Sequence, residues 1–210
     1  MITILGRSSS INVRKVLWTC SELGLLFQHE ECDIDLTAST PMQSGFVFTE
    51  LNPNAMVPVL LDNEFVLWES NTIIRYLANR YGDGSLYPHA AEARARVDQW
   101  LDWQASELNR AWSYAFMSLV RRSPEHDDTS QVLKSIQNWS RFMCILDERL
   151  KQTGAYVSGC EFSLADVSIG LSVHRWFGTP LAHPQLDAVQ DYYQRITKRP
   201  GFLNYCIGTP

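Results

Sequence analysis

A cluster of hydroxyl groups stands between an apolar run and a helical pattern near the start of the chain. Ser8, Ser9 and Ser10 precede Ile11 and Asn12, where a helix is expected to begin. A serine in this place commonly caps the helix through its hydroxyl. The unpaired N–H groups and the positive end of the helix dipole also favour an anion, and a hydroxyl directed at a thiolate adds a charge-assisted hydrogen bond. The pattern leaves both interpretations open, and capping is the more common one.

A second motif runs from Asn52 to Leu60 and contains Pro53 and Pro58. Proline is compatible with the first position of a strand, because no ladder N–H is needed there. If the Val57-Pro58 bond were cis, the turn would present the Val57 backbone outward, and an extended peptide could pair with it as an added strand. The sequence is compatible with either geometry.

The third motif, Trp68-Glu69-Ser70-Asn71, ends a strand and begins a helix. Ser70 fits the N-cap position of that helix. A helix N-terminus with a free hydroxyl also suits a carboxylate, and Glu69 beside it suits an ammonium group. Together the two side chains would fit the α-amino-acid end of a ligand.

The elements that must position these motifs alternate between strand and helix over the first eighty residues. We expect strands at 2–5, 27–34, 59–61 and 65–67, and helices at 12–23 and 70–81. The first two strands should be parallel by the crossover rule, and the last two read as a hairpin. An irregular stretch at 37–56 separates the two pairs. This order predicts a small α/β layer.

Turn residues from Gly82 to Pro88 separate this layer from a stretch with helical periodicity throughout. We therefore predict an α/β domain at 1–81 and an all-helical domain at 89–210. Its helices are expected from Ala93 toward Val120, from Val132 to Leu150, from Ser163 past Leu171, and from Leu186 to Ile196 before Pro200-Gly201. The Ser163-x-x-Asp166 pattern predicts a capping box, with a role in folding rather than catalysis.

Charge and cysteine content exclude several classes of protein. The formal net charge is −5, and no basic run exceeds Arg121-Arg122, so no nucleic-acid partner is expected. Five widely spaced cysteines without a C-x-x-C pair predict free thiols in a reducing compartment and no metal site. We expect no signal peptide, because the first residues read as a strand, and no membrane-spanning helix, because no run reaches about 18 apolar residues. We expect a cytoplasmic protein that does not bind membranes.

The three motifs in this order, on an α/β layer followed by helices, resemble the glutathione S-transferase family over essentially the whole chain. They are most similar to the bacterial cytosolic branch related to the theta class. The segments that carry the resemblance are Gly6 to Val16, Asn52 to Pro58, Glu69-Ser70 and Phe162 to Asp166. The resemblance implies a thioredoxin-like domain with a cis Val57-Pro58 bond, followed by an all-α domain that contributes the hydrophobic substrate site.

Carried onto this chain, the resemblance implies an enzyme that conjugates the thiolate of its co-substrate glutathione to a small hydrophobic electrophile. Ser10 would stabilise the thiolate, with Ser9 as the alternative if the turn is shifted by one residue. Val57 would hold the cysteinyl backbone, and Glu69 and Ser70 the γ-glutamyl end. The implied glutathione-binding residues are Ser9, Asn12, Met56, Val57, Pro58, Glu69 and Ser70.

Two parts of the implied site depart from the family pattern or are loosely specified. Met56 stands where many members carry Lys, Arg or Gln, so one polar contact to the tripeptide should be missing. Trp112 and Phe116, four residues apart on a helix, are candidates for the wall of the hydrophobic substrate site. Aromatic residues at this spacing are more often core. The resemblance also implies a homodimer.

Other activities are compatible with the same fold. Isomerisation, reductive dehalogenation and peroxide reduction would use the same glutathione site, and some relatives are non-catalytic interaction modules. The intact set formed by Ser10, Val57-Pro58 and Glu69-Ser70 favours an enzyme over an interaction module.

Overall fold

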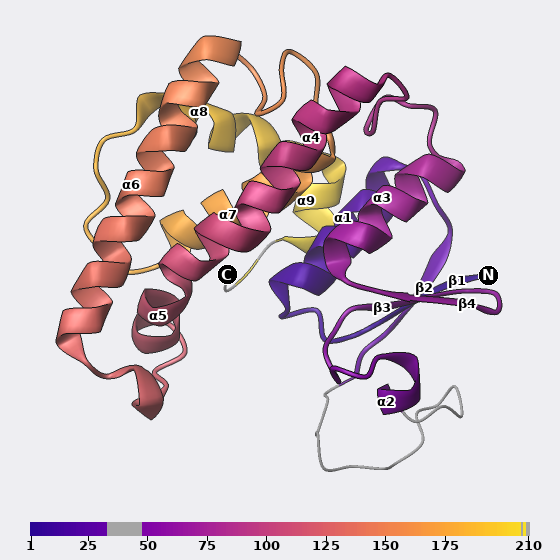
Figure 1. Cartoon of the computed structure of the whole chain (residues 1–210), viewed down its shortest axis with the longest axis horizontal. Coiled ribbons are helices and arrows are strands. Elements are labelled where there is room, and N and C mark those ends of the chain that lie inside the picture. Colours follow the sequence, from indigo (N-terminus) through magenta and orange to yellow (C-terminus); the bar gives the residue numbers. More distant parts are fainter. Residues whose placement is uncertain (33–47, 207, 209–210) are drawn as a thin grey trace. The chain divides into compact units, whose positions relative to one another are not determined.

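The computed structural model describes residues 1–32, 48–206 and 208, which form two compact units (Figure 1). Of the described residues, the first unit comprises 1–32, 48–87, 200–206 and 208, and the second comprises 88–199. The boundary before Pro88 falls at the end of the predicted linker. The C-terminal segment, however, belongs to the first unit, whereas the sequence assigns it to the helical domain.

A four-stranded sheet with the order β2-β1-β3-β4 forms the base of the first unit. The strand β1 (Ile2–Leu5) pairs in parallel with β2 (Phe27–Glu30) and antiparallel with β3 (Val59–Asp62). A two-residue turn then leads into β4 (Phe65–Trp68), which pairs antiparallel with β3. The predicted strand directions are confirmed, and β2 ends earlier than predicted.

Helices cover both faces of this sheet. Figure 1 shows α1 (Ile11–Glu22) and α3 (Ser70–Tyr81) side by side on one face and the short α2 (Phe48–Leu51) on the other. Both long helices are confirmed, whereas α2 lies in a stretch predicted to be irregular. The end of the predicted strand, at 33–34, and the first part of the predicted irregular stretch, at 37–47, lie outside the described residues.

The helix α9 (Pro200–Tyr205) corrects a prediction made from the sequence. The dipeptide Pro200-Gly201 predicts an end to helical structure, but proline is compatible with the first turn of a helix and here opens one. The ring of Phe202 packs edge-on against Trp18 of α1, with ring centroids 5.4 Å apart. A Cβ atom at Gly201 would collide with the same indole ring. Glycine at this position therefore allows α9 to approach α1 closely.

The second unit is built from helices. They are α4 (Ala91–Trp103), α5 (Asn109–Leu119), α6 (Thr129–Thr153), α7 (Leu164–Gly178) and α8 (Asp187–Ile196), with a 3-10 turn at Pro124–His126. A π-helical segment, Gln104–Leu108, interrupts the single helix predicted from 93 to 120. The buried Gln104 amide donates to the hydroxyl of Ser172 in α7 (3.0 Å), which holds the widened turn in place. None of the helices in the described part of the chain combines the length and the apolar character of a membrane-spanning segment.

The helix α7 has most of its side chains buried within the helical unit. Its Trp176 packs edge-on against Trp139 of α6, with ring centroids 4.9 Å apart. The predicted capping box is present at its start, where the Asp166 carboxylate accepts the Ser163 N–H (2.9 Å) and hydroxyl (3.0 Å) and the Val157 N–H (2.9 Å). Complete burial raises the pKa of Asp166 to about 6, against the opposing effect of these hydrogen bonds.

Candidate functional site

The turn between β1 and α1 places the serine motif at a helix N-terminus. Ser10 has extended backbone angles and occupies the N-cap position of α1, but its side chain makes no hydrogen bond to the helix. The capping role that the sequence favours is therefore not filled by this hydroxyl. Ser10 is partly buried and Ser9 is exposed. The Ser10 hydroxyl thus remains available beside the positive end of the α1 dipole.

The backbone of this turn is held from two sides. The Ser8 N–H donates to both carboxylate oxygens of Glu31, at 3.1 and 3.0 Å, and the Arg14 Nε–H donates to the Ser8 carbonyl oxygen at 2.7 Å. Hydrogen bonds from Ser8 hold the pKa of Glu31 below its ordinary value. Sequence reasoning missed both roles, because they depend on the end of β2 and the start of α1 lying next to each other. The two contacts fix the position of the serines that follow.

The proline motif folds into a loop organised by a buried asparagine. The Asn52 side chain donates to the Met56 carbonyl oxygen (2.7 Å) and accepts the Asn54 N–H (3.0 Å). The bond between Val57 and Pro58 is cis, as the family resemblance implies. Asn52 and Asn54 are not among the site residues predicted from the sequence, although both belong to the proline motif.

Gly6, at the end of β1, allows this loop to approach the sheet. Its φ is 142°, and a Cβ atom there would lie 2.8 Å from Val57 Cβ and 2.7 Å from Val13 Cγ2. Real Cβ atoms do not approach other atoms so closely, so a larger residue would push the loop away. Glycine is therefore required for the position of Val57.

The third motif begins α3 in a different way from the one predicted. Glu69, not Ser70, occupies the N-cap position, and it has a φ of 71°, in the left-handed region that few non-glycine residues adopt. Ser70 is instead the first helical residue, and its hydroxyl donates to Asn12 Oδ1 (3.3 Å). The Ser70 hydroxyl oxygen in turn accepts a hydrogen bond from the buried Lys15 Nζ at 3.2 Å. The first and third motifs are thereby joined through side chains.

One pocket of about 410 Å³ gathers these motifs. It is lined by Asn12, Asn52, Asn54, Met56, Val57, Pro58, Glu69 and Ser70. Six of the residues implied by the resemblance thus meet in one place, in a volume within the range of about 300–1,000 Å³ typical of small-molecule sites. Ser9 and Ser10 are not among the lining residues, although the turn that carries them leads directly to Asn12.

The two candidates for the hydrophobic substrate site lie in the interior of the helical unit. Trp112 is 8% exposed and Phe116 is 3% exposed, and their rings pack edge-on with centroids 5.5 Å apart. The Arg175 guanidinium lies 4.4 Å from the centre of the first ring and 4.0 Å from the centre of the second. This burial favours the core alternative and leaves little surface of either ring for a substrate.

Comparison with known proteins gives matches along nearly the whole chain. The family described as glutathione S-transferase, N-terminal domain, matches residues 9–80. Glutathione S-transferase GstB of Escherichia coli strain K12 is 35% identical over 206 residues, which cover 95% of this chain and 95% of that protein. Glutathione S-transferase 3 of Zea mays is 29% identical over 221 residues, covering 100% and 95%.

Among solved structures, the theta class glutathione S-transferase from the citrus canker pathogen Xanthomonas axonopodis pv. citri, with glutathione bound, has the same fold. Its TM-score is 0.87 at 34% sequence identity, and the match covers 99% of this chain and 97% of that chain. The similarity therefore extends beyond the N-terminal part of the chain.

Proposed function

The chain belongs to the glutathione S-transferase family, and on this premise we propose that it conjugates glutathione to a hydrophobic electrophile, with Ser10 as the residue that stabilises the thiolate. The sequence identity of 35% to the Escherichia coli protein, over 95% of both chains, supports glutathione transferase activity. One observation supports the roles of the residues. Side chains from three separate motifs converge on a single pocket of about 410 Å³.

The pocket provides complementary groups for the parts of a γ-glutamyl tripeptide. The backbone of Val57 can pair with the cysteinyl residue as an added strand. Ser70 is suited to the α-carboxylate of the γ-glutamyl end and Glu69 to its ammonium group. Asn52 fixes the loop that carries Val57, so it acts on the ligand indirectly as well as lining the pocket.

In the proposed reaction the thiol of glutathione releases its proton to solvent water, and the thiolate attacks an electrophilic carbon. A carbon–sulfur bond forms, and the leaving group departs with the electron pair of the bond that breaks. Ser10 donates a hydrogen bond to the thiolate and forms no covalent bond. The structure supports this role because the helix does not use the Ser10 hydroxyl for capping.

The energy required is within reach of this arrangement. The pKa of a thiol, about 8.5, must fall by about two units for the thiol to be mostly ionised at neutral pH, and this change corresponds to about 2.7 kcal/mol. A hydrogen bond to a charged group supplies about 1.5–3 kcal/mol, and the α1 dipole adds up to about 1 kcal/mol. Positioning of the two reactants would supply the remaining acceleration.

Substitution of Ser10 by alanine tests this proposal. With a chloroaromatic substrate, we expect kcat/KM at slightly acidic pH to fall about 10- to 100-fold, with little change in the dissociation constant of glutathione. The pH dependence of kcat/KM should shift toward higher pH, because the pKa of the bound thiol returns toward its ordinary value. Ser9→Ala is the matched control and should keep turnover. Loss in Ser9→Ala alone would assign the role to Ser9, and wild-type turnover in both variants would exclude a serine-stabilised thiolate.

A substrate panel tests the type of reaction. Chloroaromatic compounds, hydroperoxides and maleyl compounds separate conjugation from peroxide reduction and isomerisation. We expect turnover of the chloroaromatic compounds. Turnover confined to hydroperoxides or maleyl compounds would keep the glutathione site and replace the proposed reaction.

We also propose a homodimer, as the family resemblance implies. Apolar side chains are exposed on the edge strand β4 and on α3, where Phe65 is 47% exposed and Tyr81 is 38% exposed. Sedimentation at micromolar concentration should give twice the chain mass of 24.0 kDa. A monomer under these conditions would contradict the proposal.

A further inference from the structure

A lysine lies beneath the pocket and is bonded to one of its lining residues. Lys15, in α1, is only 2% exposed. Its Nζ donates to Ser70 Oγ (3.2 Å) and to Asn71 Oδ1 (2.7 Å). Because Nζ occupies an acceptor site of the Ser70 oxygen, the Ser70 proton is directed away from Lys15 and toward Asn12 Oδ1 (3.3 Å).

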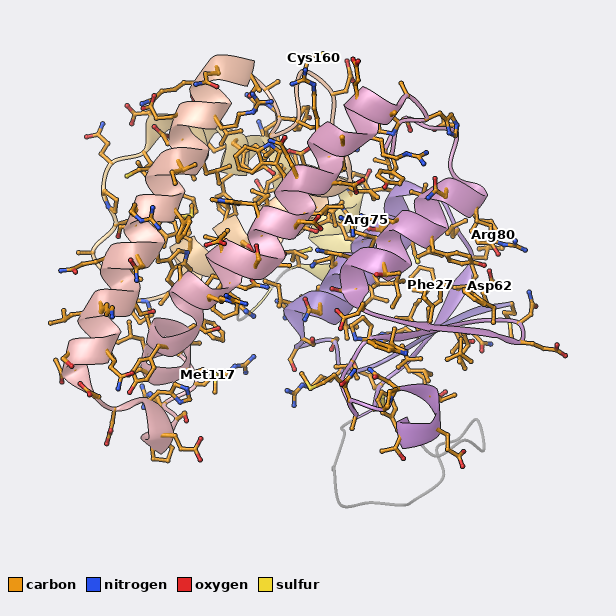
Figure 2. The ribbon with its side chains drawn as sticks, viewed as in Figure 1. Phe27, Asp62, Arg75, Arg80, Met117 and Cys160 are labelled. Carbon is orange, nitrogen blue, oxygen red and sulfur yellow. The ribbon has the colours of Figure 1, made fainter. Side chains whose placement is uncertain are left out.

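Two charged side chains shift the pKa of this lysine. Glu69, which precedes α3, and Arg75 within α3 (Figure 2) both act on Lys15, with opposite sign. The elements β1 and α9 also pack against α1, and neither contains Asp, Glu, Lys, Arg or His. Burial lowers the pKa of Lys15 to about 7, so the ammonium form is only partly populated at neutral pH.

We infer that Lys15 is the positioning residue that makes this end of the pocket select a carboxylate, by orienting the Ser70 hydroxyl toward the ligand and by placing a positive charge behind it. The inference rests on the proposed function, since it concerns the γ-glutamyl end of the same ligand. Glu69 at the mouth and Lys15 behind Ser70 present opposite charges to a zwitterionic α-amino acid. When the carboxylate arrives, the Ser70 hydroxyl rotates from Asn12 to the carboxylate, while Lys15 keeps its bond to the hydroxyl oxygen.

A comparison of two ligands and two proteins tests this role. The ligands are S-methylglutathione, which has no thiol, and its analogue with 4-aminobutyryl in place of γ-glutamyl, which lacks the α-carboxylate. We expect Lys15→Met to weaken binding of S-methylglutathione about tenfold, as for loss of a charge-assisted contact, and to leave the analogue unchanged. Cys20→Ala, another fully buried position on α1, is the control and should keep the wild-type preference for the carboxylate.

Proton uptake provides a second readout that a purely structural role would not move. A bound carboxylate favours the ammonium form of Lys15, so above about pH 7 the wild type should take up protons on binding S-methylglutathione. Calorimetry in buffers of different ionisation enthalpy measures this uptake. It should be smaller with the analogue and smaller in Lys15→Met.

The outcomes separate the two proposals. If the wild type binds neither glutathione nor S-methylglutathione, the proposed function fails and this inference fails with it. If the wild type binds and Lys15→Met keeps the full preference for the carboxylate, only the role of Lys15 is overturned. If Lys15→Met does not fold, equal proton uptake with the two ligands in the wild type overturns it.

Discussion

Replacing Asp166 by alanine tests how far the capping box supports the helical unit. The carboxylate is fully buried and accepts the backbone N–H groups of Val157 and Ser163, each at 2.9 Å. The variant leaves both donors buried without this acceptor, at a cost of about 1–3 kcal/mol each. When the wild-type carboxyl is neutral, the free energy of unfolding should therefore fall by about 2–6 kcal/mol.

The loss of stability in Asp166→Ala should depend on pH, and the burial of the carboxyl determines whether it grows or shrinks on acidification. The folded-state pKa of Asp166 is raised from 3.8 to about 6, so between these values the folded protein holds a proton that the unfolded chain has released. The resulting stabilisation is fully present below about pH 4 and is lost as the pH rises through about 6. The gap of about two units corresponds to about 3 kcal/mol, and the alanine variant lacks it. The difference between wild type and variant should widen by up to that amount on acidification.

Urea unfolding followed by tryptophan fluorescence, at about pH 7 and about pH 4.5, measures this difference. General destabilisation by acid cancels, because it affects both proteins. Asp187→Ala removes an exposed carboxylate from the first turn of α8 and serves as the control, with an expected change of at most about 1 kcal/mol. If the difference in unfolding free energy between the wild type and Asp166→Ala stayed constant or narrowed at the lower pH, the reasoning would be refuted. Turnover per folded molecule should be unchanged in Asp166→Ala.

Two other substitutions test the backbone around the proposed site. Glu31→Ala removes the acceptor of the Ser8 N–H and should lower kcat roughly tenfold with a smaller effect on KM; Glu30→Ala is the control, and equal losses in the two variants would contradict a specific role for Glu31. Gly6→Ala places a Cβ atom 2.8 Å from Val57 Cβ and should raise the KM for glutathione and lower the free energy of unfolding by about 1–3 kcal/mol. Unchanged glutathione binding in the folded alanine variant would show that the loop tolerates the displacement.

Much of the fold follows from patterns that are local in the sequence. The buried positions of α1, among them Val13, Val16 and Leu17, recur at helical spacing, so the pattern predicts both the helix and its buried face. The hairpin of β3 and β4 is equally local, because only the three polar residues 62–64 separate two apolar runs. The capping box at Ser163 is a signal only four residues long and is also predicted correctly.

The residues that sequence reasoning missed depend on contacts that are distant in the chain. Lys15 meets Ser70, which is 55 positions away, and Ser8 meets Glu31, which is 23 positions away. Neither contact leaves a periodic or local signal. The prediction that helical structure ends at Pro200 was wrong for a different reason. Proline is compatible with both the end and the start of a helix, and packing against Trp18 selects the start.

The burial of two cysteines in the first unit has a consequence for a protein that handles thiols. Burial raises the pKa of Cys20 and of Cys206 to about 12, so nearly all of both side chains stay in the thiol form at neutral pH. Exchange with disulfides requires a thiolate as the attacking group. Both sulfur atoms should therefore remain unmodified when oxidised glutathione accumulates. The packing that holds α1 and α9 together also keeps the protein's own buried sulfur out of the chemistry that it is proposed to promote in its ligand.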